Sequence, residues 1–134
     1  MQKKLLVLTI IFLLTFISFS GCNSSDDMEK NKFIGSWTGE DITTNMFDGT
    51  AYPLGTIILI FYTNNTFLCR INWYYVTPPT NTYTGPWNIS NGKISFQDYS
   101  SKAYIINDAQ YTFSDNDQSL KIDTGYFYYK LKKV

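Results

Sequence analysis

Few side chains in this chain could do chemistry, and most of them lie in expected turns. The sequence has no histidine, so it lacks the ordinary base that activates a serine or cysteine nucleophile. Polar turn segments contain most of the aspartates: Asp48, Asp98, Asp108, Asp115, Asp117 and Asp123. Glu40 and Asp41 differ, because they stand near the end of the first expected strand and could approach a barrel mouth. No spacing forces two carboxylates into the pair, about 5 to 9 Å apart, that a glycosidase needs, so we expect no enzyme activity.

The two cysteines, Cys22 and Cys69, have different expected roles. Cys69 falls on the apolar face of an expected hairpin, where a thiol is buried and inert. Cys22 is a candidate for lipid attachment, because a cysteine thiolate is a nucleophile that can take up lipid. If Cys22 is modified, Cys69 has no partner in the chain, and no disulfide is expected.

The residues before Cys22 have the composition of a secretion signal. Two lysines precede an apolar run over 5–19, and small residues follow it at 20–21. The run is shorter than the roughly 20 residues that a membrane-spanning helix needs. We therefore expect a cleaved signal peptide over residues 1–21.

The end of this segment, Phe19-Ser20-Gly21-Cys22, resembles the lipoprotein box, at which the cysteine becomes the new N-terminus and receives lipid. The resemblance implies a lipid on Cys22, and two acyl chains would hold the protein stably at a membrane. An ordinary signal peptide and a tethering helix that is never cut are the alternatives. All three interpretations place the protein at the cell membrane, facing the extracytoplasmic side.

The remainder of the chain divides into a linker and one domain. Residues 22–30 are polar without periodicity and predict a flexible linker after the lipidated cysteine. Residues 31–134 are enough for a single domain with one core. The chain has 11 basic and 11 acidic residues, and removal of Lys3 and Lys4 leaves 9 against 11. This slight negative charge argues against a nucleic-acid partner.

From residue 33 onward, apolar and polar residues alternate with a period of two, and β-branched and aromatic residues dominate. Three turns would place apolar residues opposite each other, and hairpins are expected there. The turns are centred on Asn64-Asn65, Asn91-Gly92 and Thr124-Gly125. The expected pairs include Ile60 with Cys69, Trp87 with Phe96, and Leu120 with Tyr129.

The alternation and the turns together predict an all-β domain. Strands are expected near 33–43, 55–63, 66–76, 83–90, 93–97, 102–106, 109–114, 119–123 and 126–133. Consecutive strands joined by short turns make an antiparallel up-and-down meander. Eight or nine such strands close most easily into a small barrel, which leaves no exposed edge. An open sandwich is the structural alternative.

The first strand also suggests a family. Phe33-Ile34-Gly35-Ser36-Trp37 is similar to the Gly-x-Trp start of the first strand in lipocalin-like domains. More specifically, the chain resembles short lipocalin-like lipoproteins of archaea and bacteria over segments 61–67, 85–93, 111–120 and 129–131. The resemblance implies a lipocalin-like β-barrel and, by analogy with lipocalins, capture of an apolar ligand. Where lipocalins place an arginine from the last strand over the tryptophan, this sequence offers Lys130, Lys132 or Lys133.

Two functions stay open at this stage. In the first, the barrel binds a small apolar or amphipathic ligand against a wall of Trp37, Ile57, Leu59, Trp73 and Trp87. In the second, the interior is filled and exposed tyrosines contact other envelope proteins or glycans, since an eight-stranded barrel is just wide enough for side chains to fill. A cavity of about 300 Å³ or more would favour the first function.

The sequence also allows predictions about glycosylation, metal and cofactor binding, and oligomeric state. Asn64 and Asn88 each begin an Asn-x-Ser/Thr sequence at an expected exposed position, and they are candidates for N-glycosylation. No metal site is expected, because Asp115, Asn116 and Asp117 lack the terminal glutamate and the full oxygen set of a calcium loop. We expect no cofactor, and we expect a monomer.

Overall fold

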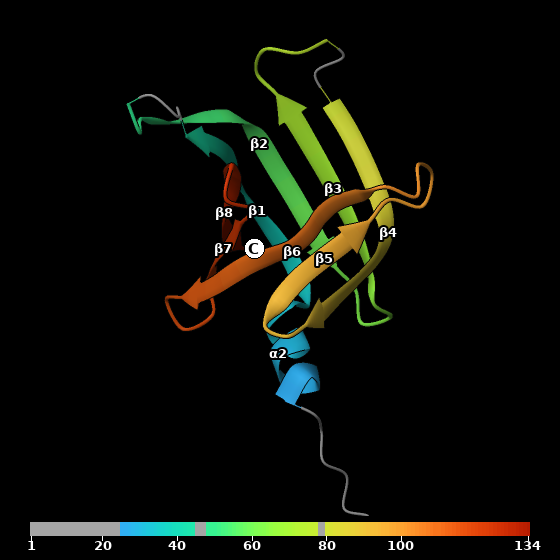
Figure 1. The fold of residues 1–134 in the computed structure, drawn as a ribbon. Coiled ribbons are helices and arrows are strands. Elements are labelled where there is room, and N and C mark those ends of the chain that lie inside the picture. The colour runs from blue at the N-terminus through green and yellow to red at the C-terminus, as the bar shows by residue number, and fades with distance from the viewer. Residues whose placement is uncertain (1–24, 45–47, 78–79) are drawn as a thin grey trace, which may run out of the picture.

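The computed structural model describes residues 25–44, 48–77 and 80–134 (Figure 1). The expected signal peptide and Cys22 lie outside these residues. One helix, α2 (Ser25–Phe33), precedes eight strands. The strands are β1 (Gly35–Thr44), β2 (Ala51–Phe61), β3 (Thr66–Trp73), β4 (Thr80–Ser90), β5 (Lys93–Gln97), β6 (Tyr104–Ser114), β7 (Ser119–Asp123) and β8 (Phe127–Lys133).

The strands form a closed antiparallel barrel. Each strand pairs with the next, and β8 returns to pair with β1, for example Leu131 with Gly39. This closure confirms the predicted up-and-down barrel and excludes the open sandwich. Segments 102–106 and 109–114, expected as two strands, are one strand, β6. Asp108 has a φ of 51°, and the register with β5 shifts nearby, so a bulge bends β6 without ending its pairing.

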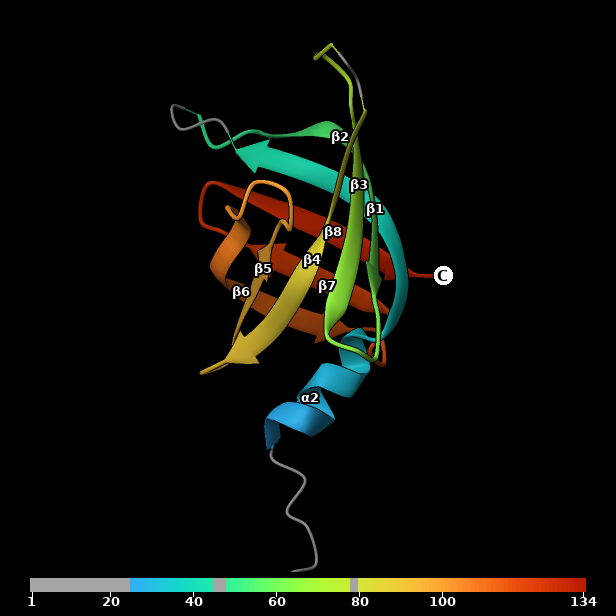
Figure 2. The ribbon, with the colours of Figure 1, turned by 90° about the vertical axis from the view of Figure 1, so that its right-hand side faces the viewer.

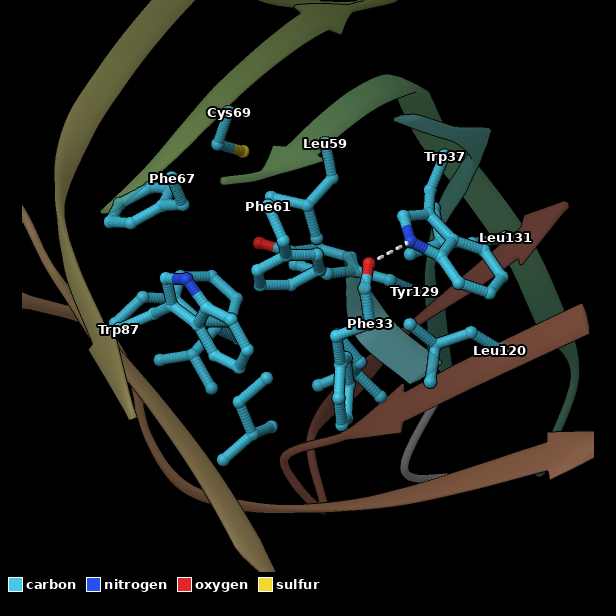
Figure 3. Packing of buried hydrophobic residues seen from close by; sticks show 14 of the residues in the cluster. Phe33, Trp37, Leu59, Phe61, Phe67, Cys69, Trp87, Leu120, Tyr129 and Leu131 are labelled. Carbon is cyan, nitrogen blue, oxygen red and sulfur yellow. Dashed lines mark hydrogen bonds between the residues drawn. The ribbon is translucent and has the colours of Figure 1, made fainter. Parts of the chain in front are cut away.

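The interior of the barrel is filled largely by aromatic and branched side chains (Figure 3). They come from alternate residues of each strand, as the period of two predicts. The buried hydrophobic cluster comprises Phe33, Trp37, Ile57, Leu59, Phe61, Phe67, Cys69, Ile71, Trp87, Ile89, Ile94, Phe96, Ile106, Ala109, Leu120, Ile122, Tyr129 and Leu131. The expected placement of Cys69 in the core is therefore confirmed.

One end of the barrel is closed by helix α2 (Figure 2). The sequence predicts a flexible linker up to Lys30 and a strand from residue 33, and the structure differs from both predictions. Acidic Asp26 and Asp27 in the first turn and basic Lys30 in the last complement the helix dipole. The helix ends on Phe33, which is fully buried in the barrel. In the described part of the chain, no helix has the length and apolar character to cross a membrane.

Phe33 anchors the helix through ring contacts. Its ring centroid lies 5.4 Å from that of Phe61, 4.9 Å from that of Tyr111 and 4.8 Å from that of Phe113, each in an edge arrangement. The Trp87 ring is 5.7 Å away. Edge contacts of this kind add to the free energy of area burial. In the sequence, Phe33 is only an apolar residue at the start of an expected strand. Its role in holding the helix against the end of the barrel was therefore not predicted.

The Gly-x-Trp segment joins the helix, the first strand and the last strand. The Trp37 indole Nε1 donates a hydrogen bond to the Phe33 carbonyl oxygen at 2.7 Å (Figure 3). The Lys133 ammonium lies 5.1 Å from the Trp37 ring centroid and donates to the Lys32 carbonyl oxygen at 3.2 Å. Lys133 therefore takes the place over the tryptophan for which the sequence offered three lysines. Gly35 has a φ of 123°, and a Cβ there would lie 3.3 Å from the Lys133 Cε.

Two of the three predicted hairpins differ in register from the structure. The hairpin at Asn91-Gly92 is confirmed: Trp87 pairs with Phe96, and the two turn residues have φ values of 53° and 69°. Both positions of a type I′ turn need positive φ, which explains why this signal was reliable.

The predicted register between β2 and β3 is wrong by one residue. Cys69 pairs with Leu59 and not with Ile60. The loop has three residues, 63–65, and Asn65 takes a φ of 61°, as in the common three-residue hairpin with a left-handed last position. A shift of one residue exchanges the two faces of a strand, so Leu59 points inward.

The predicted register between β7 and β8 is wrong by two residues. Tyr129 pairs with Ile122 and not with Leu120. The Thr124 backbone N–H donates to the Phe127 carbonyl oxygen at 3.0 Å, and the Thr124 hydroxyl donates to the same oxygen at 2.9 Å. The turn therefore closes one residue later than predicted. A shift of two residues keeps each side chain on its predicted face.

Candidate functional site

A cavity of about 340 Å³ lies in the barrel at the end opposite α2. Six strands and the loop between β5 and β6 contribute to its wall. The lining residues are Asp41, Leu54, Ile71, Trp73, Tyr83, Ser101, Ala103, Tyr104, Ile105, Phe127 and Tyr129. Helix α2 fills the other end, so the cavity opens at one end of the barrel only.

Asp41 is the charged residue of this wall, and the strand register explains its position. It lies on β1 between Gly55 of β2 and Tyr129 of β8. A Cβ at Gly55 would lie 2.4 Å from the Asn72 carbonyl oxygen, so this neighbour has no room for a side chain. A register shift follows directly after Asp41, between it and Ile42. Gly55 therefore places backbone, and no side chain, next to Asp41.

The Asp41 side chain is buried, and its hydrogen bonding is incomplete. The residue is 2% exposed, and its Oδ1 atom has no hydrogen-bond partner among the described residues. Leaving a buried acceptor unpaired costs about 1–3 kcal/mol, and more for a charged group. Asp98, the other buried aspartate, is different: it accepts hydrogen bonds from the Ser101 N–H at 2.8 Å and from the hydroxyl groups of Ser100 and Ser101. Asp41 is therefore the buried carboxyl group that a ligand could satisfy.

Burial sets the protonation of the groups around the cavity. Desolvation raises the pKa of Asp41 from 3.8 to about 6. Desolvation, followed by the nearby Asp41 charge, raises the pKa of the Cys69 thiol to about 12. The same two causes, together with Cys69 and Tyr83, hold the pKa of Tyr129 well above its usual value. At neutral pH this interior thus contains a carboxylate beside a neutral thiol and a neutral phenol.

The rest of the wall is aromatic and apolar. Trp73, Tyr83, Phe127 and Tyr129 contribute rings, and the centroids of the last two lie 5.7 Å apart. Among the residues that the structure describes, no lysine or arginine lines the cavity. Ligand pockets in proteins have this character: mostly apolar and aromatic walls with a few polar groups that orient the ligand.

The five residues predicted as a ligand-contacting wall all lie in or against the buried core, and one of them lines this cavity. Trp73 lines the cavity. Ile57 and Leu59 are fully buried deeper in the core. Trp37 and Trp87 lie near the closed end, where both are close to Phe33. Ligand contact by any of the five stays a prediction.

Sequence reasoning missed Tyr83, Phe127 and Tyr129 as cavity residues, although it placed Asp41 near a barrel mouth. The alternation of Tyr129 with Leu131 indicated an inward side chain. Its depth along the barrel depends on the β7–β8 register, which the sequence predicted wrongly. No local pattern distinguishes an aromatic ring that fills the core from one that borders a cavity.

The predicted glycosylation positions are both exposed. Asn64 lies in the loop after β2, where its side-chain oxygen accepts a hydrogen bond from the Thr66 hydroxyl at 2.6 Å. Asn88 lies on the outer face of β4. Their use stays a prediction. Among the residues that the structure describes, no group of three or more acidic, cysteine or histidine side chains comes together as a metal site.

A larger hollow, of about 420 Å³, lies against β7 and β8 and is lined partly by outward-facing lysines. Three of its four charged side chains, those of Asp115, Lys121 and Lys132, have ionic partners, and the fourth, that of Lys130, is exposed to water. The Lys132 ammonium lies 2.9 Å from an Asp115 carboxylate oxygen, and that of Lys121 lies 2.7 Å from one of Asp123. This hollow therefore lacks the unsatisfied polar group that marks the barrel cavity.

No protein-family model and no curated protein sequence matches the chain. At the level of structure, it is similar to the crystal structure of a lipocalin-like protein from Bacteroides uniformis. The two superpose with a TM-score of 0.53 and 13% sequence identity, over 77% of this chain and 99% of that chain. This level of identity bears on the fold alone. Together with the closed antiparallel barrel, the similarity shows that the chain has a lipocalin-like barrel fold.

Proposed function

We propose that this protein is a lipid-anchored extracytoplasmic lipoprotein whose barrel binds a small apolar or amphipathic molecule. The observation that carries the proposal is the cavity of about 340 Å³ at the open end of the barrel. It exceeds the roughly 300 Å³ at which ligand sites begin. Its volume equals that of about eleven liquid water molecules at about 30 Å³ each, so the ligand is small.

The position of α2 supports the proposed anchor. Cys22 precedes Ser25 by three residues, which span at most about 11 Å when extended. A lipid on Cys22 would therefore hold the closed end of the barrel next to the membrane. The cavity at the opposite end would then face away from the lipid surface and receive ligands from the extracytoplasmic space.

Native mass spectrometry of the full chain, purified gently from its own host, tests ligand binding. We expect a reproducible non-covalent mass that is lost on denaturation. A protein that carries no such mass, and that also binds no small apolar probe when titrated, would contradict the proposal. In the same sample, a diacyl group on an N-terminal Cys22 is expected, whereas an intact Met1 would contradict the proposed anchor.

A second function, contact with envelope proteins or glycans, is favoured by the tyrosines at the open end. In an up-and-down barrel, the carboxyl ends of β1, β3, β5 and β7 and the starts of β2, β4, β6 and β8 all lie there. Exposed tyrosines in or next to these strand ends are Tyr52, Tyr74, Tyr75, Tyr99, Tyr104 and Tyr126. Replacing Tyr75 and Tyr126 by serine would weaken binding to such a partner and leave ligand binding in the cavity unchanged.

A further inference from the structure

We propose that the ligand of the barrel cavity is an organic ammonium ion with an apolar body, held by the Asp41 carboxylate. The inference rests on the proposed ligand-binding function and adds the chemical class of the ligand. Three observations on the described residues support it: a buried carboxylate oxygen without a hydrogen-bond partner, an aromatic cavity wall and a wall that includes no lysine or arginine.

The acceptor is Asp41 Oδ1, which is buried and has no hydrogen-bond partner among the described residues. Asp41 is one of the residues that line the cavity, so a ligand that binds there lies beside this residue. An ammonium N–H donates a charge-assisted hydrogen bond to a carboxylate, and such bonds are about twice as strong as neutral ones. A primary or secondary ammonium thus supplies what the fold leaves unsatisfied.

The wall suits a cation in its other contacts. Trp73, Tyr83, Phe127 and Tyr129 surround the cavity with rings whose faces are electron-rich. Aromatic rings combined with a carboxylate are the means by which proteins bind organic ammonium groups. Anionic ligands are disfavoured, because none of the described residues that line the cavity is a lysine or arginine and because Asp41 would repel them.

Protonation of Asp41 should control this binding. The other titratable groups that face the cavity or lie close to Asp41 are Tyr83 of β4, Tyr104 of β6, Tyr129 of β8 and Cys69 of β3. The pKa of Asp41 is raised to about 6 by burial, so the carboxylate is largely protonated at pH 5 and ionised at pH 7.5. The affinity for an ammonium ion should therefore fall as the pH is lowered through 6.

Calorimetric titration of the full chain with three probes of similar size tests the proposal. The probes are 2-phenylethylamine, 2-phenylethanol and 3-phenylpropionate, which are cationic, neutral and anionic at pH 7.5. We expect the amine to bind about tenfold or more tightly than the alcohol, as one hydrogen bond to a charged group implies. We expect the carboxylate to bind most weakly, and the preference for the amine to be lost at pH 5.

The decisive variant is Asp41→Asn, which keeps the shape and removes the charge. It should lose about tenfold or more of the affinity for the amine and keep the affinity for the alcohol. Asp123→Asn is the matched control, because it removes one carboxylate on the outer surface, where Asp123 pairs with Lys121. This control should bind all three probes as the wild type does.

The outcomes separate the two proposals. If the alcohol binds and the amine binds no better, or if Asp41→Asn leaves the amine affinity unchanged, the ammonium inference is wrong and ligand binding stands. If none of the three probes and no larger apolar molecule binds, both proposals are wrong. A preference for the amine that Asp123→Asn reduces as much as Asp41→Asn would show surface attraction and would also overturn the inference.

Discussion

At the scale of single residues, Asp41 is a group that folding stability alone does not explain. A carboxyl group in a largely apolar interior loses its hydration, and here one of its oxygens gains no hydrogen bond in return. Groups that are kept at such a cost to stability are typical of functional sites. Sequence reasoning could place Asp41 near a barrel mouth, because β1 was recognised. It could not detect the missing hydrogen bond, which depends on neighbours from other strands.

The pH dependence of stability should reveal the Asp41 carboxyl directly. Its folded-state pKa of about 6 lies above the value of 3.8 in the unfolded chain, so the folded state binds the proton more tightly. The contribution of Asp41 to the free energy of unfolding is therefore most favourable below pH 4, and it is lost as the pH rises through 6. The change is on the order of 3 kcal/mol, from two pKa units at about 1.4 kcal/mol each.

Denaturant unfolding of wild type and Asp41→Asn at pH 4 and pH 7.5 measures this effect. The free energy of unfolding of Asp41→Asn, relative to that of the wild type, should increase by about 3 kcal/mol between pH 4 and pH 7.5. Asp123→Asn should change in the opposite direction, since hydrogen bonds from Lys121 and Gly125 lower the pKa of Asp123. Identical pH dependence in wild type and Asp41→Asn would show that Asp41 is not buried as described.

At the scale of elements, helix α2 closes one end of the barrel. Its composition is polar, and its one fully buried side chain is Phe33. A nine-residue helix is too short to be stable in water alone, so its order depends on contact with the barrel. This dependence explains why residues 25–30 were predicted as a linker: the stabilising contacts lie in residues far away along the chain.

Truncation of Phe33 tests the role of the helix. Phe33→Ala should lower the free energy of unfolding by about 3–5 kcal/mol, as large-to-small changes of buried aromatic residues do. Met28→Ala, on the same helix but 64% exposed, is the control and should stay within about 0.5 kcal/mol of wild type. Thermal or denaturant unfolding measures both changes. Equal effects of the two substitutions would contradict the role of Phe33 in anchoring the helix in the barrel.

At the scale of the whole molecule, the two ends of the barrel have different chemistry. The closed end has short turns rich in asparagine and aspartate, at 62–65, 91–92 and 115–118. The open end has the cavity and most of the exposed tyrosines. This difference between the two ends fits the proposed anchor. The proposed lipid lies on the side of α2, so the open end would face the surroundings.

The three tryptophans report on the two ends separately. Trp37 and Trp87 are at most 2% exposed, whereas Trp73 is half-buried at the cavity. Acrylamide should therefore quench mainly the Trp73 fluorescence, and Trp73→Phe should remove most of the quenchable emission. A cavity ligand should protect Trp73 from the quencher. Strong quenching in Trp73→Phe would show instead that the closed end admits small molecules.

Local sequence patterns were sufficient to predict most of the strands, the Asn91-Gly92 hairpin and the antiparallel barrel. These features depend on residues close together in the chain: alternation decides which side chains face inward, and a type I′ turn requires particular residues. The signal segment is predicted from local composition in the same way, and it stays a prediction.

The folded barrel was needed to establish the exact registers, the burial of Phe33, the position of Lys133 over Trp37 and the cavity beside Asp41. Each of these depends on the volumes and hydrogen-bonding groups of side chains from several strands, which become neighbours only when the barrel closes. A cavity is the space that those side chains together do not fill, and no local pattern in the sequence specifies that remainder.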